Sequence, residues 1–196
     1  MKDLSRKQVT EIKLFGKWSF QGVEANDAGL RRCMSLKPVA IPHSMGRHEH
    51  KRFRKANVDI VERLLNNVMR PGKNAGKKTK AISILKNSFE LINIRTGRNP
   101  IEVLVRAVEN SAPCEDTTRL SYGGIAYRLS VDIAPLRRVD LALRNLCDGA
   151  RQAAINNPRS IEECLAEELI LASNHDMKSN AVSRRHEIER IAKASR

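Results

Sequence analysis

From residue 58 onward, apolar side chains recur every three or four residues, and prolines and glycines divide this repeat into segments. In the first segment, Val58, Val61, Leu65 and Val68 fall on one helical stripe, and a proline and a glycine follow its end. Such a stripe is typical of an amphipathic helix that buries one face. The sequence therefore predicts a body that is mainly α-helical.

The same repeat predicts five further helices. They cover residues 75–96, 99–110, 135 to about 155, 160 onward, and 181–193. Gly97 follows the second helix, where a left-handed closing residue is favoured. Asn99 can cap the third helix ahead of Pro100, and Ser160 can cap the fifth.

One stretch changes its period from a helical repeat to a two-residue repeat. Ile125, Tyr127, Leu129 and Val131 alternate with small or polar residues, which predicts a strand with one apolar face. Two glycines precede it, so residues 117–122 are expected to be the first arm of a β-hairpin at about 117–133. A lone ribbon is marginally stable, so its outer part should rest on the helices or be ordered by a partner. Tyr127 could pack in the core or contact a partner.

Residues 1–55 lack a sustained repeat and hold two prolines, so they are expected to form an extended basic arm without a core of its own, with a short element near 12–18. The expected architecture is a six-helix domain at 56–196 with one protruding β-hairpin and this N-terminal arm at 1–55. Residues 1–10 lack an apolar segment, which predicts no secretory signal and a protein that stays inside the cell.

Positive charge is concentrated in one part of the chain. The formal net charge is +14, and residues 41–80 hold 11 Lys and Arg against three Asp and Glu. Two clusters stand out there: Lys51, Arg52, Arg54 and Lys55, then Lys73, Lys77, Lys78 and Lys80. Together with Arg137 and Arg138, they predict an electropositive face that binds the phosphates of nucleic acid. Membrane binding is less favoured, because no stretch combines basic residues with a broad apolar insertion face.

Signatures of catalysis, metal binding or cofactor binding are weak. Residues 72–78 resemble a phosphate-binding loop, but the glycine spacing is short and a lysine replaces the hydroxyl residue that would bind magnesium. His43, His48 and His50 could be drawn as a metal site, yet no coordinating cysteine is nearby. We therefore expect a protein that is not an enzyme, with no metal and no cofactor. The four cysteines are widely spaced and are expected to be buried thiols.

Aromatic residues are only 4% of the chain, so recognition should depend on phosphates and shape rather than on a stacking platform. The alternative is a helical DNA-binding regulator, because short basic helices can enter a major groove. It is less favoured, since no compact helix-turn-helix with a polar recognition helix stands out.

Several ordered stretches resemble a single family over roughly residues 36–196. They are IPHSMGRHEHKRFRK at 41–55, IVERLL at 60–65, NPIEVLV at 99–105, GGIAYRLSVDIAPLRR at 123–138, GARQAA at 149–154 and SIEECLAEE at 160–168. The chain resembles the S-seven family of small-subunit ribosomal proteins, called S-five in eukaryotes. The element EIKLFGKW at 11–18 is similar to the archaeal and eukaryotic branch.

The resemblance implies a cytoplasmic protein of the small ribosomal subunit that binds the 3′ major domain of small-subunit rRNA and nucleates assembly of the subunit head. It implies a hairpin near mRNA and exit-site tRNA, and neighbouring ribosomal proteins of the head and platform. The expected rRNA contacts are Arg47, Lys51, Arg52, Arg54, Lys55, Lys73, Lys77, Lys78, Lys80, Arg137 and Arg138. The expected hairpin positions near mRNA and tRNA are Arg119, Tyr122, Gly123, Gly124, Ile125 and Arg128. Tyr122 departs from the smaller or basic residue common in relatives.

Overall fold

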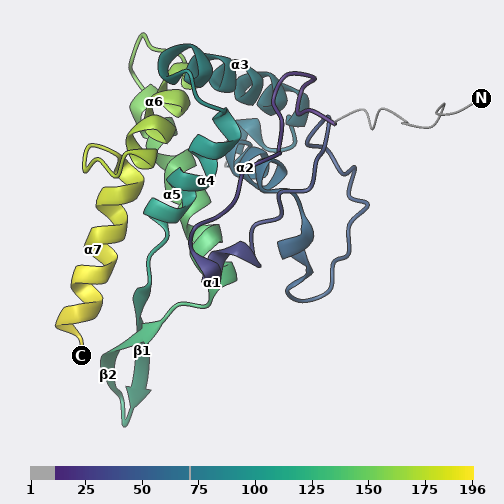
Figure 1. The fold of residues 1–196 in the computed structure, drawn as a ribbon. Helices are drawn as coiled ribbons and strands as arrows, with labels where there is room; N and C mark the ends of the chain where they lie inside the picture. The colour runs from purple at the N-terminus through teal and green to yellow at the C-terminus, as the bar shows by residue number, and fades with distance from the viewer. Residues whose placement is uncertain (1–11, 71) are drawn as a thin grey trace, which may run out of the picture.

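The computed structural model describes residues 12–70 and 72–196 of the chain (Figure 1). The expectation of no secretory signal concerns residues 1–10, which lie outside the described residues, as do Glu11 of the EIKLFGKW element and the side chain of Lys73. The structure is mainly helical with one two-stranded antiparallel hairpin, as the sequence predicts.

All six predicted helices are present. They are α2 (Ile60–Val68), α3 (Lys78–Thr96), α4 (Pro100–Ser111), α5 (Pro135–Ala154), α6 (Ile161–Ser173) and α7 (Asn180–Ala194). Side chains of Asp59, Asn99, Ser160 and Ser179 accept a backbone N–H at the starts of α2, α4, α6 and α7, which satisfies donors that a helix leaves free. α3 begins three residues later than predicted, because Gly76 has a φ of 77° that is outside the helical region.

Three single-turn elements were not predicted. They are α1 (Ala28–Arg31), η1 (Arg54–Asn57) and η2 (Gly72–Asn74). In α1 the side chain of Asp27 accepts the N–H of Gly29 at 2.8 Å. An element this short contains no apolar repeat, which is why periodicity does not reveal it.

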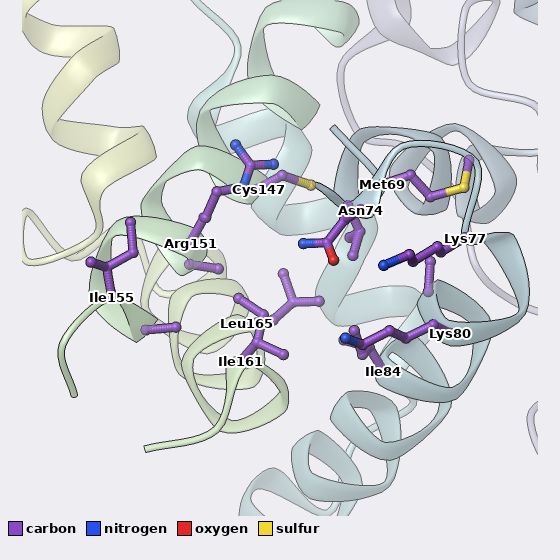
Figure 2. A pocket seen from close by; sticks show the side chains of 14 residues that line it. Met69, Asn74, Lys77, Lys80, Ile84, Cys147, Arg151, Ile155, Ile161 and Leu165 are labelled. Carbon is purple, nitrogen blue, oxygen red and sulfur yellow. The ribbon is translucent and has the colours of Figure 1, made fainter. Parts of the chain in front are cut away.

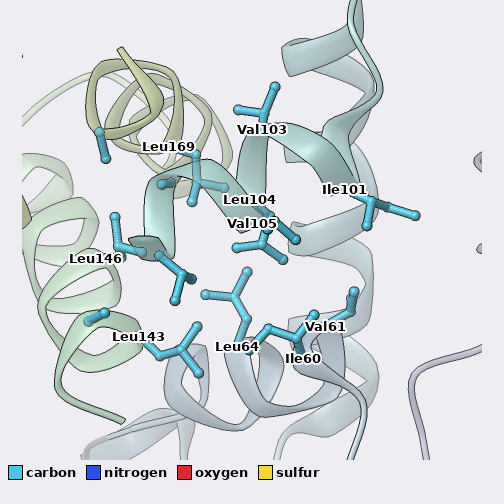
Figure 3. Close-up of a cluster of buried hydrophobic side chains, with 14 of the residues drawn as sticks. Ile60, Val61, Leu64, Ile101, Val103, Leu104, Val105, Leu143, Leu146 and Leu169 are labelled. Atoms are coloured by element: carbon cyan, nitrogen blue, oxygen red, sulfur yellow. The ribbon is translucent and has the colours of Figure 1, made fainter. Parts of the chain in front are cut away.

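The core lies where α2, α4, α5 and α6 meet. Leu64 of α2, Leu104 of α4 and Leu143 of α5 are fully buried and face a common interior (Figure 3). α6 packs against α3, α4 and α5. Burying one such side chain is worth about 1.5–3 kcal/mol, so these helices hold one another in place.

The described part of the N-terminal segment packs on this core rather than extending away from it. Leu14 and Leu30 are fully buried, and the ring of Trp18 lies edge-on to that of Phe89 in α3, with centroids 5.8 Å apart. The short element expected near 12–18 is a tight turn closed by a bridge between Leu14 and Trp18. Apolar residues scattered without a period supply these contacts, so the sequence pattern suggests an extended arm where the structure has a wrapped segment. A domain boundary at residue 55 stays a prediction.

The hairpin consists of β1 (Glu115–Tyr122) and β2 (Ile125–Asp132) and protrudes from the helical body (Figure 1). Tyr122 pairs with Ile125 across the turn, and Gly123 and Gly124 have φ of 59° and 83°, the region that two-residue hairpin turns require. The base of the hairpin contacts α7. Its outer part does not rest on the helices: Tyr127 is 53% exposed, so it is not a core residue.

Two further features bear on function. The four cysteines are free, but Cys114 is exposed and Cys33 is half-buried, so the expectation of buried thiols is correct only for Cys147 and Cys164. Within the described ranges, every helix is too short or too polar to cross a bilayer.

Candidate nucleic-acid interface

A groove lies between α2 and α5 and continues to the start of α3. It consists of three adjoining hollows of about 330, 200 and 230 Å³. The first two share Asn67, Arg70 and Arg144, and the last two share Cys147 and Arg151. We call it the basic groove. The residues that give it charge are Lys55, Arg63, Arg70, Lys77, Lys80, Asp140, Arg144, Asp148 and Arg151.

Helical spacing explains how these side chains come together. On α5, Asp140, Arg144, Asp148 and Arg151 follow one another at intervals of four, four and three residues, so they lie along one face of the helix. Arg63 and Arg70, seven residues apart, form the opposite wall with Asn67. The described part of the lining holds seven Lys and Arg against two carboxylates, so the groove is strongly positive.

Asp140 neutralises part of this charge. It forms ion pairs with Lys55 and with Arg63, whose Nη2 lies 2.9 Å from Asp140 Oδ1. Arg63 is buried and also donates to the backbone carbonyl of Cys33 at 2.7 Å. It therefore ties α2 to α5 and to the N-terminal segment, and it offers little surface to a ligand.

Lys78 is also held inside the protein. Its Nζ donates to Glu62 Oε1 at 2.6 Å, and Glu62 accepts the backbone N–H and the hydroxyl of Ser44 at 3.0 and 2.9 Å. Burial alone would raise the pKa of Glu62, but the hydrogen bonds from Lys78 and Ser44 outweigh it and lower that pKa. Lys78, which is expected from sequence to contact RNA, anchors α3 and the loop at residue 44 to α2.

Four other groove cations have no acidic partner among the described residues. They are Arg70, Lys77, Lys80 and Arg144, and all four are exposed. Cations left without a counter-charge on one surface repel one another, and a polyanion relieves this repulsion. Arg70 and Arg144 were not among the residues predicted from sequence.

The loop before α2 carries the first predicted cluster at the end of the groove. Lys51 and Arg54 both lie near Glu49, at 3.7 and 3.2 Å, while the Arg52 guanidinium lies 5.0 Å from the centroid of the Phe53 ring. Arg47 is exposed. The rings of His48 and His50 are 4.6 Å apart, yet the described residues contain no group of three metal-ligating side chains close enough to hold an ion.

The two arginines at the start of α5 differ from each other. Arg137 is exposed and lies 3.5 Å from Asp116 of the hairpin. Arg138 is only 14% exposed, pairs with Asp27 at 3.1 Å and donates from Nε to the carbonyl of Pro113. Arg138 therefore fastens α5 to α1 and to the base of the hairpin, and only Arg137 presents its charge to solvent.

The hairpin has two chemically distinct faces. Leu120, Tyr122, Ile125, Tyr127 and Leu129 lie on one face, and each is at least half exposed. On the other face, Arg119 lies directly opposite Arg128, and both are exposed with no acidic partner in the described part of the chain. Like charges opposite each other destabilise a ribbon, so this pair favours an anionic partner.

Comparison with known proteins identifies the family. The family model described as "Ribosomal protein S7p/S5e" matches residues 30–196. The chain belongs to this family. A relative named small ribosomal subunit protein uS7, from Cenarchaeum symbiosum, is 51% identical over 197 residues, covering 96% of this chain and 99% of the relative. Proteins of the same name from Methanothermobacter thermautotrophicus and Methanosphaera stadtmanae are each 50% identical, covering 93% and 94% of this chain and 98% of each relative.

The S7p/S5e match confirms the resemblance found in the sequence, and the archaeal relatives agree with the archaeal and eukaryotic branch. Members of this family are structural ribosomal components, so the chain is not an enzyme, as predicted. The match begins at Leu30, a fully buried residue of α1.

Proposed function

We propose that this ribosomal protein binds small-subunit rRNA in its basic groove. The observation that carries the proposal is the set of exposed cations without acidic partners, Arg70, Lys77, Lys80 and Arg144, along one continuous groove. Each contact of such a cation with a phosphate releases condensed counterions, so affinity should fall steeply as salt rises. Arg47, Lys51, Arg52, Arg54 and Lys55 extend the same surface toward the loop before α2.

The family resemblance supports the 3′ major domain of the small-subunit rRNA as the target and nucleation of head assembly as the consequence. In this proposal Lys78 and Arg138 act indirectly, by holding α3, the hairpin base and α5 in place. The hairpin, with its exposed tip and its Arg119–Arg128 pair, reaches mRNA and exit-site tRNA. In this proposal the protein's other partners in the cytoplasmic ribosome are neighbouring proteins of the head and platform.

The test is the salt dependence of binding to an RNA transcript of the 3′ major domain. This transcript is taken from the genome that encodes the protein. Replacing Arg70 and Arg144 with Ala should weaken binding and reduce the slope of log K against log salt by about 1.4–1.8, because two phosphate contacts are lost. The matched control replaces Arg106 and Arg159, which are exposed, paired with Glu102 and Glu167, and outside the groove. The control removes the same charge and should leave the slope nearly unchanged.

Equal loss of slope in both double variants would mean that only net charge matters, and would contradict a specific groove. A DNA duplex of similar length serves as the comparison for the alternative of a DNA-binding regulator. Binding to that duplex as tight as binding to the transcript, at the same salt, would favour that alternative.

A further inference from the structure

The third hollow of the basic groove differs from the other two in its chemistry. It lies between the start of α3 and the facing ends of α5 and α6, and its volume is about 230 Å³. Most of its lining is apolar, including Met69, Ile84, Ile161 and Leu165, whereas the other two hollows are lined mainly by polar and charged side chains. We call it the apolar hollow.

Among the described residues, polar groups line the apolar hollow only at one side and at its junction with the rest of the groove. The amino ends of Lys77 and Lys80 and the carboxamide of Asn74 point from the α3 side toward Leu165 and Ile161 (Figure 2). These three polar ends have no hydrogen-bond or ion-pair partner among the described residues. Arg151 marks the junction with the second hollow, where its guanidinium is held by Asp148 at 2.7 Å.

Cys147, which also lies at this junction, carries no charge. The thiol of Cys147 is buried, which raises its pKa to about 12, so it stays protonated at neutral pH. A ligand of this hollow therefore needs a flat or compact apolar part, an edge that hydrogen-bonds to an amide, and a negative charge close by.

An unstacked nucleotide has this combination. Its base faces are apolar, its edge carries donors and acceptors that match the two sorts of group on an Asn side chain, and its phosphate suits the two ammonium groups. Proteins that take a base out of its stack hold it between aromatic or apolar side chains. The apolar hollow adjoins the rest of the basic groove at Arg151 and Cys147. An RNA strand in the groove would therefore bring such a nucleotide to it.

We propose that the apolar hollow receives one unpaired base of the bound RNA, with Asn74 at the base edge and Lys77 and Lys80 at its phosphate. This inference rests on the proposed function of the groove and adds a mode of recognition to it. The groove cations hold the backbone, and the hollow selects a site where the RNA can release a base.

A variant that fills the hollow without changing any charge tests the inference. Ala154 ends α5, is partly exposed and lines the hollow, whereas its neighbour Ala153 is exposed and does not line it. Ala154→Phe should therefore block the base, and Ala153→Phe is the matched control. The probe is the 3′ major domain transcript, measured by filter binding over a range of salt and by acylation of ribose 2′-hydroxyls.

Ala154→Phe should weaken binding at least about 5-fold at every salt concentration, because the base would lose its contacts with the apolar side chains of the hollow. The salt slope should not change, since no cation is lost. Binding of the wild type or of Ala153→Phe should change the acylation of one unpaired nucleotide. Binding of Ala154→Phe should not change it. Asn74 is exposed, so Asn74→Ala leaves the apolar core intact, and it should weaken binding by about 5-fold. If Ala154→Phe is misfolded, the affinity of Asn74→Ala tests the inference in its place.

The inference would be overturned if Ala154→Phe and Asn74→Ala both bind the RNA with the affinity of the wild type and give the same acylation pattern. The proposed function would still stand in that case if the wild type binds with a steep salt slope. Absence of salt-dependent binding by the wild type would instead overturn the proposed function. If RNA binding is unchanged but Ala154→Phe no longer enters subunits reconstituted from purified components, the hollow receives a protein side chain, and the inference is wrong.

Discussion

Lys78 Nζ lies 2.6 Å from Glu62 Oε1, and the two side chains are only 19% and 7% exposed. The preceding residue, Lys77, is exposed and has no acidic partner among the described residues. Two adjacent lysines of one basic cluster therefore have different roles. Lys78 stabilises the fold, and Lys77 is available to a ligand.

We expect Lys78→Ala to lower the free energy of unfolding by about 3 kcal/mol, because it leaves the buried carboxylate of Glu62 without its cation. Lys77→Ala should change that free energy by less than about 0.5 kcal/mol, as is usual for an exposed side chain. Urea denaturation of both variants measures the difference.

RNA binding should show the reverse order for these two lysines. Lys77→Ala should reduce the salt slope by about 0.7–0.9, the value for one phosphate contact, and Lys78→Ala should leave the slope unchanged under conditions where it is folded. Similar slopes for the two variants would contradict the division of roles between them.

The helices could be predicted from sequence because each carries its own apolar stripe and its own start signal. The stripe of α2 and the Asn99–Pro100 start of α4 are local features, so they can be read without knowing the rest of the fold. The packing of Leu14, Trp18 and Leu30 could not be predicted, because these residues have no period and their burial depends on helices far along the chain.

The interface was only partly predictable for a related reason. Charge clusters indicate which segments are basic, but the partner of each cation is set by tertiary contacts, such as that between Arg138 and Asp27. Arg70 and Arg144 are 74 residues apart and neither belongs to a cluster, so no local pattern marks them. Only the packing of α2 on α5 brings them into one groove.

Asp59, which caps α2, should make stability depend on pH. Its burial raises the pKa of its carboxyl from 3.8 to about 7, and its Oδ1 has no hydrogen-bond partner in the described structure. The folded state then keeps a proton that the unfolded state releases near pH 4. The stability gained from this proton is complete below about pH 4 and is lost as pH rises toward 7.

The wild type should therefore lose about 2–3 kcal/mol of unfolding free energy between pH 5 and pH 8 through this group, and Asp59→Asn should not show this loss. Urea midpoints of both proteins at the two pH values measure it, and the difference between the proteins removes the effect of other titrating groups. Glu62 does not interfere, because its pKa is lowered from 4.5. Its titration therefore changes the free energy of unfolding only below pH 4.5. Parallel pH profiles for the two proteins would show that Asp59 is ionised in the folded state.

The proposed reach of the hairpin toward exit-site tRNA depends on the shape of its tip. Gly124 has a φ of 83°, and Tyr122 beside it is 84% exposed. Valine is strongly disfavoured at this φ, whereas asparagine tolerates positive φ, so Gly124→Val should distort the turn and Gly124→Asn should preserve it.

In reconstituted subunits, Gly124→Val should assemble like the wild type, as judged by sedimentation, because the tip makes no contact with the helical core. It should lower tRNA occupancy of the exit site, measured by footprinting, and Gly124→Asn should behave like the wild type. The two variants differ only at a solvent-exposed turn, so a difference between them reports the shape of the tip rather than the loss of glycine. If Gly124→Val instead blocks assembly of the head and leaves exit-site occupancy normal in the subunits that form, the hairpin acts in assembly, and the role proposed for it is wrong.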